Sequence, residues 1–195
     1  VINHKININN FTASLRVFST ENFNLGTTQS IEVIPIAEPW SNGTGQIEDN
    51  PQTTNGVSWV FRTDKDLDQS WTTSSYSSGT TGSWTASNAA GGGVWYTQSA
   101  WINTSNYDLV DNFDLTLDLT PAVIQHYSGN INNYGFIIKR PETQERSLEE
   151  LGILNFFSRE THTIYAPLLE FKWDDSVYST GSLSIVGEDF DLNLK

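Results

Sequence analysis

The sequence predicts an all-β protein, an antiparallel β-sandwich of jelly-roll type that carries one or two short helical turns. The first observation behind this prediction is that apolar and polar residues alternate with a period of two in several stretches, as in strands with one buried face. The second is that Gly, Pro, Asn or Ser bound these stretches. The third is that helical patterns are few and short. Many short strands separated by turn residues are typical of a sandwich or a barrel.

The predicted strands show this alternation to different degrees, and turn residues bound them. The clearest is 113–119, where every odd residue is apolar and every even residue is polar, and 190–194 repeats the pattern. Asp114, Asp118 and Asp191 take polar positions of these strands, so we expect much of the negative charge on a solvated sheet face. The other predicted strands, in chain order, are residues 14–19, 30–37, 57–62, 134–139, 168–173 and 182–186.

Two segments carry helical signals. Residues 120–127 have Thr120 as the predicted N-cap and Pro121 at the first helical position, and Gly129 follows the apolar face. Residues 147–150 form a capping box that Gly152 closes quickly. Both segments are short enough that we expect turns of helix on a β scaffold.

The length indicates a single domain over residues 1–195, because a chain of 195 residues can bury one substantial core. Residues 64–93 resemble a linker in composition, since they are rich in Ser, Thr, Gly and Ala. Linkers lack tryptophan, however, and Trp71, Trp84, Trp95 and Trp101 punctuate this segment and its exit. We therefore predict a long ordered loop inside the domain, pinned by its indoles.

The charge of the chain excludes several classes of partner. There are 23 Asp and Glu against 10 Lys and Arg, a net charge of −13, and Lys139-Arg140 is a short basic pair. Nucleic-acid backbones and anionic membranes bind clustered cations, so we expect neither as a partner. The absence of Cys excludes a thiol nucleophile, a disulfide framework and a thiolate zinc site.

Catalytic motifs do not emerge from the sequence, and we predict a protein that is not an enzyme and has no cofactor. The three histidines are distant from one another and form no two-histidine metal spacing. A G-x-S-x-G elbow is absent from the sequence. A carboxylate pair for glycoside hydrolysis stays open, because the separation of such a pair in space defines its mechanism.

A weak calcium signal lies at Asp64, Asp66 and Asp68, where acids alternate as at the start of a calcium loop. The turn position that an EF-hand reserves for Gly is Gln69, and the closing Glu position is Ser75. The sequence therefore allows either a looser calcium site in a sandwich loop or a plain exposed acidic turn.

An aromatic group is the most suggestive constellation in the sequence. Exposed indoles on a rigid β surface stack on sugar rings or anchor a protein partner, whereas buried ones fill a core or pin a loop. Both interpretations remain open for the residues of this group, Trp84, Trp95, Tyr96 and Trp101.

Several stretches, taken in order, resemble a DNRLRE-type domain, a β-sandwich module of bacterial and archaeal surface proteins. These stretches are residues 13–18, 31–40, 55–59, 117–120, 132–139 and 157–160 leading to 167–171. Phe157-Ser158-Arg159-Glu160 is the loose counterpart of the string that gives such domains their name. The resemblance begins at a strand well inside such domains, and the chain starts with Val1 and contains no Met. We therefore expect the C-terminal part of a longer protein that lacks the first strands of its sandwich.

The resemblance implies a non-catalytic module, because similar sandwiches occur in carbohydrate-binding jelly rolls and in bacteriophage virions as decoration, neck or tail components. We expect a structural and adhesion module on the exterior of an assembly, at a virion surface or in an extracellular setting. Its expected partners are neighbouring protein subunits and, at the aromatic group, a glycan. The alternative is a carbohydrate-binding module of a secreted or cell-surface bacterial protein.

Overall fold

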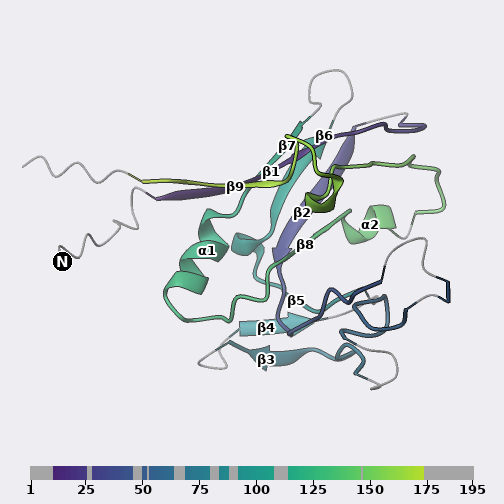
Figure 1. Ribbon diagram of the computed structural model, residues 1–195. Coiled ribbons are helices and arrows are strands. Elements are labelled where there is room, and N and C mark those ends of the chain that lie inside the picture. Colours follow the sequence, from purple (N-terminus) through teal and green to yellow (C-terminus); the bar gives the residue numbers. More distant parts are fainter. Residues whose placement is uncertain are drawn as a thin grey trace, which may run out of the picture.

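The computed structural model describes residues 11–25, 28–45, 50–51, 53–63, 69–79, 84–87, 92–107, 114–145 and 147–173. Short strands dominate this part of the chain, and they pair only in antiparallel fashion (Figure 1). The strands are β1 (Thr12–Phe18), β2 (Gln29–Pro35), β3 (Tyr76–Ser78), β4 (Trp84–Ser87), β5 (Trp95–Tyr96), β6 (Asn103–Tyr107), β7 (Asp114–Asp118), β8 (Phe136–Lys139) and β9 (Leu168–Lys172). The helices are α1 (Thr120–Tyr127), α2 (Glu142–Glu145) and two 3-10 turns, Ser99–Trp101 and Arg159–Thr161.

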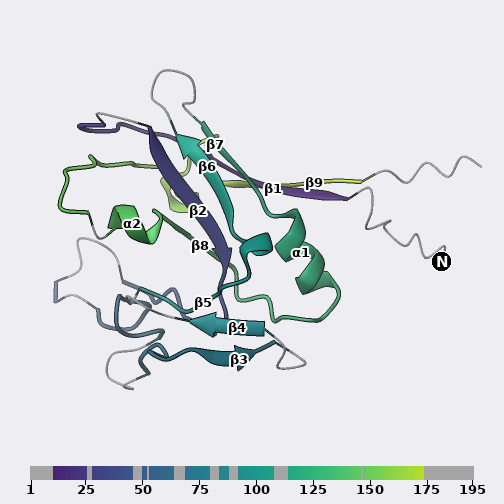
Figure 2. The same cartoon turned by 180° about the vertical axis from the view of Figure 1, so that it is seen from behind.

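Two three-stranded sheets form the body of the molecule. The first has the strand order β7-β1-β9 and the second the order β6-β2-β8, so β1 and β2 are the central strands. In the first sheet Leu15 lies opposite Leu117 of β7 on one side and opposite Leu169 of β9 on the other. β1 and β9 run side by side as a ribbon that extends beyond the rest of the sandwich (Figures 1 and 2).

These two sheets share one hydrophobic core. Alternate residues of β7 point inward, where Leu115 and Leu117 are buried, while Asp118 is exposed as the period of two predicts. The same core takes buried residues from both sheets, namely Ala13, Val17, Ile31, Val33, Tyr107, Leu115, Leu117 and Leu119. The predicted all-β class is therefore confirmed, with two antiparallel sheets packed against each other as in a sandwich.

A third small sheet, β3-β4-β5, lies at one end of the body (Figure 1). It has its own buried cluster, which includes Trp71, Val94, Tyr96 and Trp101, and a bridge between Ile36 and Trp95 joins it to the chain that follows β2. Two of its strands fall inside residues 64–93, which were expected to be a loop. Strands of three or four residues are too short for alternation to mark them, so the sequence does not predict this pairing.

The helical predictions meet a mixed outcome. α1 spans residues 120–127 as predicted, but Leu119 is its N-cap, and Asp118 Oδ1 accepts the Thr120 N–H at 2.9 Å. The hydroxyl of Thr120 instead accepts the Ala13 N–H at 2.9 Å, which fastens α1 to β1. The predicted helical turn at 147–150 is wrong, because Ser147 Oγ accepts the Glu149 N–H in a tight turn.

The strand predicted at residues 57–62 is also wrong. Ser58 donates its N–H to the Phe61 carbonyl at 2.7 Å and accepts the Phe61 N–H on its hydroxyl at 3.0 Å. These local bonds fold the segment back on itself in place of a ladder, although Phe61 keeps one isolated bridge to Ser70. The strands predicted at 182–186 and 190–194 lie outside the described residues.

A long connection after β8 covers one side of the body. Gly152 makes its backbone approach possible, because at φ +73° a Cβ there would lie 2.5 Å from the carbonyl oxygens of Phe23 and Asn24. Phe23 and Ile153 then exchange two backbone hydrogen bonds of 3.1 and 2.8 Å. No helix in the described part of the chain is long and apolar enough to cross a membrane.

Candidate functional site

The structure places two of the four predicted aromatic contacts in the core. Tyr96 is 1% exposed and Trp101 is 7% exposed, and their rings meet edge to face with centroids 5.5 Å apart. The Tyr96 hydroxyl is 3.2 Å from Ser78 Oγ, so it joins β5 to β3. Burial raises the pKa of this hydroxyl. These two rings hold the end sheet together, which is the loop-pinning alternative that the sequence left open, and they present no face to a ligand.

The other two aromatic residues of the predicted group, Trp84 and Trp95, are not part of that buried pair. Trp84 begins β4 and pairs through its backbone with Ser78, while its side chain is outside the described part of the structure. Trp95 is half-buried, and the Lys139 ammonium lies 5.2 Å from the centroid of its ring.

The residues of the predicted calcium site, Asp64, Asp66 and Asp68, lie outside the described residues. Among the residues that are described, no group of three or more His, Asp or Glu could hold a metal ion.

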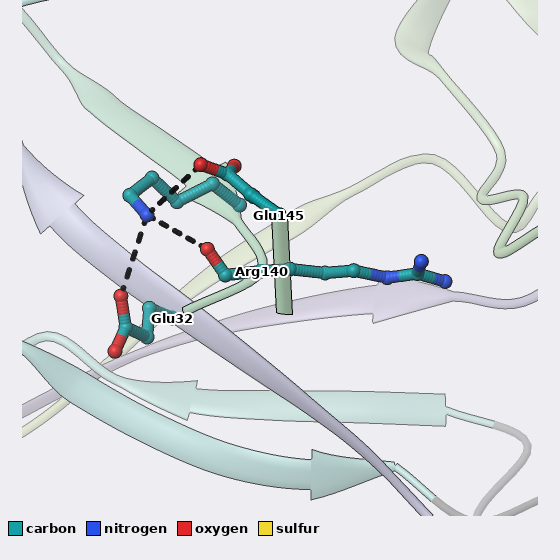
Figure 3. Close-up of polar contacts among 4 residues, drawn as sticks. Glu32, Arg140 and Glu145 are labelled. Atoms are coloured by element: carbon teal, nitrogen blue, oxygen red, sulfur yellow. Dashed lines mark hydrogen bonds and ion pairs between the residues drawn. The ribbon is translucent and has the colours of Figure 1, made fainter. Parts of the chain in front are cut away.

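A charged cluster surrounds Lys139 at the end of β8 (Figure 3). The side chain of Lys139 is 8% exposed, and its Nζ lies 3.6 Å from Glu32 Oε2 on β2 and 3.5 Å from Glu145 Oε2 on α2. The same nitrogen donates to the Arg140 carbonyl at 2.7 Å. The cluster therefore joins β2, β8 and α2 through one nearly buried cation.

Among the described residues, Glu32 and Glu145 are the only two carboxylates that contact the same cation. Their contacts with Lys139 are those of a structural ion-pair network, with no space left for a ligand. An ammonium has three donors, and three oxygen partners surround this one. A glycosidase needs free space between its two carboxylates for the scissile bond. Here the lysine nitrogen lies between Glu32 and Glu145, so the pair is occupied by the protein itself. Sequence alone had shown these residues only as polar positions of strands and loops.

The edge strand β9 is unusual in its exposure. All five of its residues are exposed, and Leu168, Leu169 and Phe171 retain between 42% and 50% of their accessible surface. Leu169 and Phe171 lie on the face of the sheet that carries Leu15 and Ala13, where the core lies. At its far end Phe171 stacks on Phe11, with ring centroids 5.8 Å apart. An apolar edge strand with an open side is a surface that pairs readily with another chain.

Two grooves lie on the described surface. One of about 620 Å³ lies between the core and the connection after β8, and it is lined mostly by apolar side chains that include Val17, Ile31, Ile153, Leu154 and Phe156. The other, of about 530 Å³, surrounds Trp59 in the segment between β2 and β3. The sequence predicts Trp59 within a strand, and its neighbours Val57, Val60 and Phe61 give no signal of its exposure.

Comparison with protein-family models, curated proteins and solved structures finds no match for this chain.

Proposed function

We propose that this chain is a non-enzymatic structural and adhesion module on the exterior of an assembly, and that β9 joins it to a second copy of itself. The observation that carries the proposal is the exposed edge of β9, where Leu169 and Phe171 continue the core face and keep 44% and 42% of their accessible surface. Pairing two such edges would turn two three-stranded sheets into one sheet of six strands.

The sequence of β9 is complementary to itself in one register. With two copies antiparallel and Phe171 opposite its counterpart, Glu170 of each copy faces Lys172 of the other, and Leu169 faces Trp173. Trp173 follows β9 directly and is exposed. Opposite charges across a strand pair are stabilising, and like charges are destabilising. Shifting the centre to Glu170 would place two glutamates opposite each other, so the charge pattern favours the first register.

Two further observations support a structural role over catalysis. The carboxylates of Glu32 and Glu145 are held by Lys139, with the lysine nitrogen in the space that a substrate would need. The larger groove has a mostly apolar lining, and Arg140, which contributes to it, donates to the carbonyls of Leu151 and Gly152. The polar groups near this groove are therefore committed to the fold.

For the assembly itself we propose a bacteriophage virion, in which the chain would serve as a decoration, neck or tail component. The support for this setting is the acidic, cysteine-free composition and the resemblance to sandwich modules found in such particles. A symmetric pairing through one strand edge suits particles that repeat one subunit many times. An extracellular surface protein is the other setting that the same composition fits.

Sedimentation velocity over a range of concentrations tests the pairing. We expect a concentration-dependent dimer for the natural chain and a monomer for Phe171→Glu, because that change puts two like charges at the centre of the new pair. Leu148→Glu is the matched control, since Leu148 is fully exposed in the connection between α2 and β9, outside β9 itself, and its replacement should leave the dimer intact. A monomer at every concentration would contradict the proposal.

A charge reversal tests the register. Glu170→Lys alone should weaken the dimer by roughly tenfold, because it creates two like-charge contacts in place of two favourable ones. The double variant Glu170→Lys with Lys172→Glu restores both opposite-charge contacts and should recover the dimer. Equal effects of the single and double variants would mean that the two edges meet in another register.

A further inference from the structure

The groove around Trp59 differs from the rest of this acidic molecule in its chemistry. It has a volume of about 530 Å³, and the described residues that line it carry no formal charge, although the chain as a whole has a net charge of −13. The lining combines amide and hydroxyl side chains with apolar ones, and it includes Asn42, Thr53, Asn55, Ser58, Trp59 and Val60. Its size lies within the range of small-molecule sites.

Trp59 is held in place although it is largely exposed. Its side chain keeps 61% of its accessible surface, yet its benzo ring lies directly against Gly92. A Cβ at residue 92 would lie 2.7 Å from Trp59 Cζ3, so only glycine permits this contact. The Gly92 N–H also donates to the Trp59 carbonyl at 2.9 Å. The backbone thus fixes the position of an indole whose remaining surface is open to solvent.

The polar groups beside Trp59 are fixed as well. Asn55 exchanges hydrogen bonds with Thr44, in which Asn55 Nδ2 donates to Thr44 Oγ1 at 2.9 Å. Gly43 and Gly56 let the two backbones meet, because a Cβ at Gly43 would lie 1.8 Å from the Asn55 carbonyl oxygen. The groove is therefore a built surface, and it needs little rearrangement to receive a ligand.

We propose that this groove binds a neutral glycan, with the apolar face of a sugar ring on Trp59 and its hydroxyls on the amides and hydroxyls around it. An exposed, rigid indole supplies apolar contact area at small entropic cost, and uncharged amides match uncharged hydroxyls without the desolvation cost of an ion. An anionic glycan would find no cation among the described residues of the lining. A purely apolar peptide would offer the exposed surface of these amides and hydroxyls nothing in place of the water that it displaces.

This inference does not depend on the pairing through β9. The segment that carries Trp59 lies beside β5, at the end of the molecule away from the free end of the β1 and β9 ribbon (Figures 1 and 2). A dimer formed through β9 would leave both grooves open, and each copy would present one site.

Affinity electrophoresis in native gels tests the proposal with defined probes. The gels would contain, one at a time, a β-1,4-glucan, a xylan, a mannan, a galactan and dextran as neutral polysaccharides, and a polygalacturonate as an anionic one. We expect at least one neutral polysaccharide to retard the natural chain, and Trp59→Ala to lower the affinity by roughly tenfold or more, as truncation of an aromatic hot spot does. The matched control is Tyr127→Ala, because that aromatic ring is exposed on α1, outside both the groove and β9, and its loss should leave the retardation unchanged.

A second variant tests whether binding needs the Trp59 ring in its observed position. Gly92→Ala keeps Trp59 but displaces its ring, so it should also weaken retardation, while thermal unfolding monitored by circular dichroism confirms that each variant is folded. The proposal is overturned if no neutral polysaccharide retards the natural chain, if only the anionic one does, or if Trp59→Ala and Tyr127→Ala behave alike. Because sedimentation reports the β9 dimer separately, failure of one proposal is distinguishable from failure of the other.

Discussion

Lys139 is the only cation that contacts the carboxylates of Glu32 and Glu145 among the described residues. Replacing it with Met would keep most of its stem but leave the carboxylates of Glu32 and Glu145 without the ammonium that lies 3.6 and 3.5 Å from them. We expect Lys139→Met to lower the free energy of unfolding by roughly 3 kcal/mol, as removal of one partner from a buried ion pair does. Urea denaturation followed by tryptophan fluorescence measures this loss.

The control for Lys139 is a cation in an exposed pair. Arg16 Nη2 lies 2.9 Å from Asp114 Oδ2, but both side chains are well exposed, so Arg16→Met should cost less than about 1 kcal/mol. Similar losses for Arg16→Met and Lys139→Met would show that burial of the Lys139 cluster adds nothing to its strength.

His126 makes stability depend on pH. Burial lowers the pKa of its imidazole, although the nearby backbone of Ile131 and Asn132 opposes the shift. Neither ring nitrogen reaches hydrogen-bond geometry, and the ring packs edge to face on Phe136 at 5.7 Å. The folded protein therefore takes up this proton less readily than the unfolded chain, in which the pKa is about 6.5, and stability falls as the pH drops below that value.

Thermal unfolding between about pH 7 and pH 5 checks this behaviour, because Asp and Glu titrate mostly below that window. We expect the natural chain to lose more stability over the window than His126→Leu, which has no proton to take up. His162→Asn serves as the matched control, since His162 is exposed in the left-handed conformation that Asn tolerates. If the natural chain and His126→Leu share one pH profile, the buried imidazole does not titrate as inferred.

At the scale of elements, Gly152 decides how the connection after β8 docks on the body. Both Gly152 and Gly129 have positive φ, +73° and +70°, but only Gly152 has backbone within 4 Å of the place where a Cβ would stand. Gly152→Ala should therefore cost roughly 3 kcal/mol, and Gly129→Ala about 1 kcal/mol from conformation alone. Hydrogen exchange at Phe23 and Ile153 should quicken only in Gly152→Ala, and equal exchange in both variants would refute the close approach.

The sequence predicts those elements whose own pattern of apolar and polar residues shows which face is buried. The alternation of β7 and the Pro-led start of α1 are local signals of a sheet face and a helix start, and both elements occur where expected. Residues 57–62 have the apolar and aromatic composition of a strand, but Ser58 and Phe61 hydrogen-bond to each other, so the segment forms a turn. The exposure of Trp59 and β9, like the burial of Tyr96 and Trp101, depends on what packs nearby, and a one-dimensional pattern cannot show it.

At the scale of the whole molecule, the net charge opposes the dimer that the apolar edge of β9 favours. Two copies that each carry −13 repel one another over distances longer than a hydrogen bond, while Glu170 and Lys172 attract across the pair only at contact. Salt shortens the Debye length from about 20 Å at about 20 mM to about 4 Å at about 500 mM, so it removes the long-range repulsion first. Apolar contacts between Leu169, Phe171 and Trp173 do not weaken with salt in this way.

We therefore expect salt to strengthen the dimer. Sedimentation equilibrium from about 20 mM to about 500 mM sodium chloride should show the dissociation constant falling by roughly tenfold, with most of the change below about 150 mM. Phe171→Glu should stay monomeric throughout, because screening cannot restore the apolar contact that it removes. A dimer that dissociates as salt rises would mean that opposite charges hold the copies together, and the apolar edge of β9 would then not be the joint.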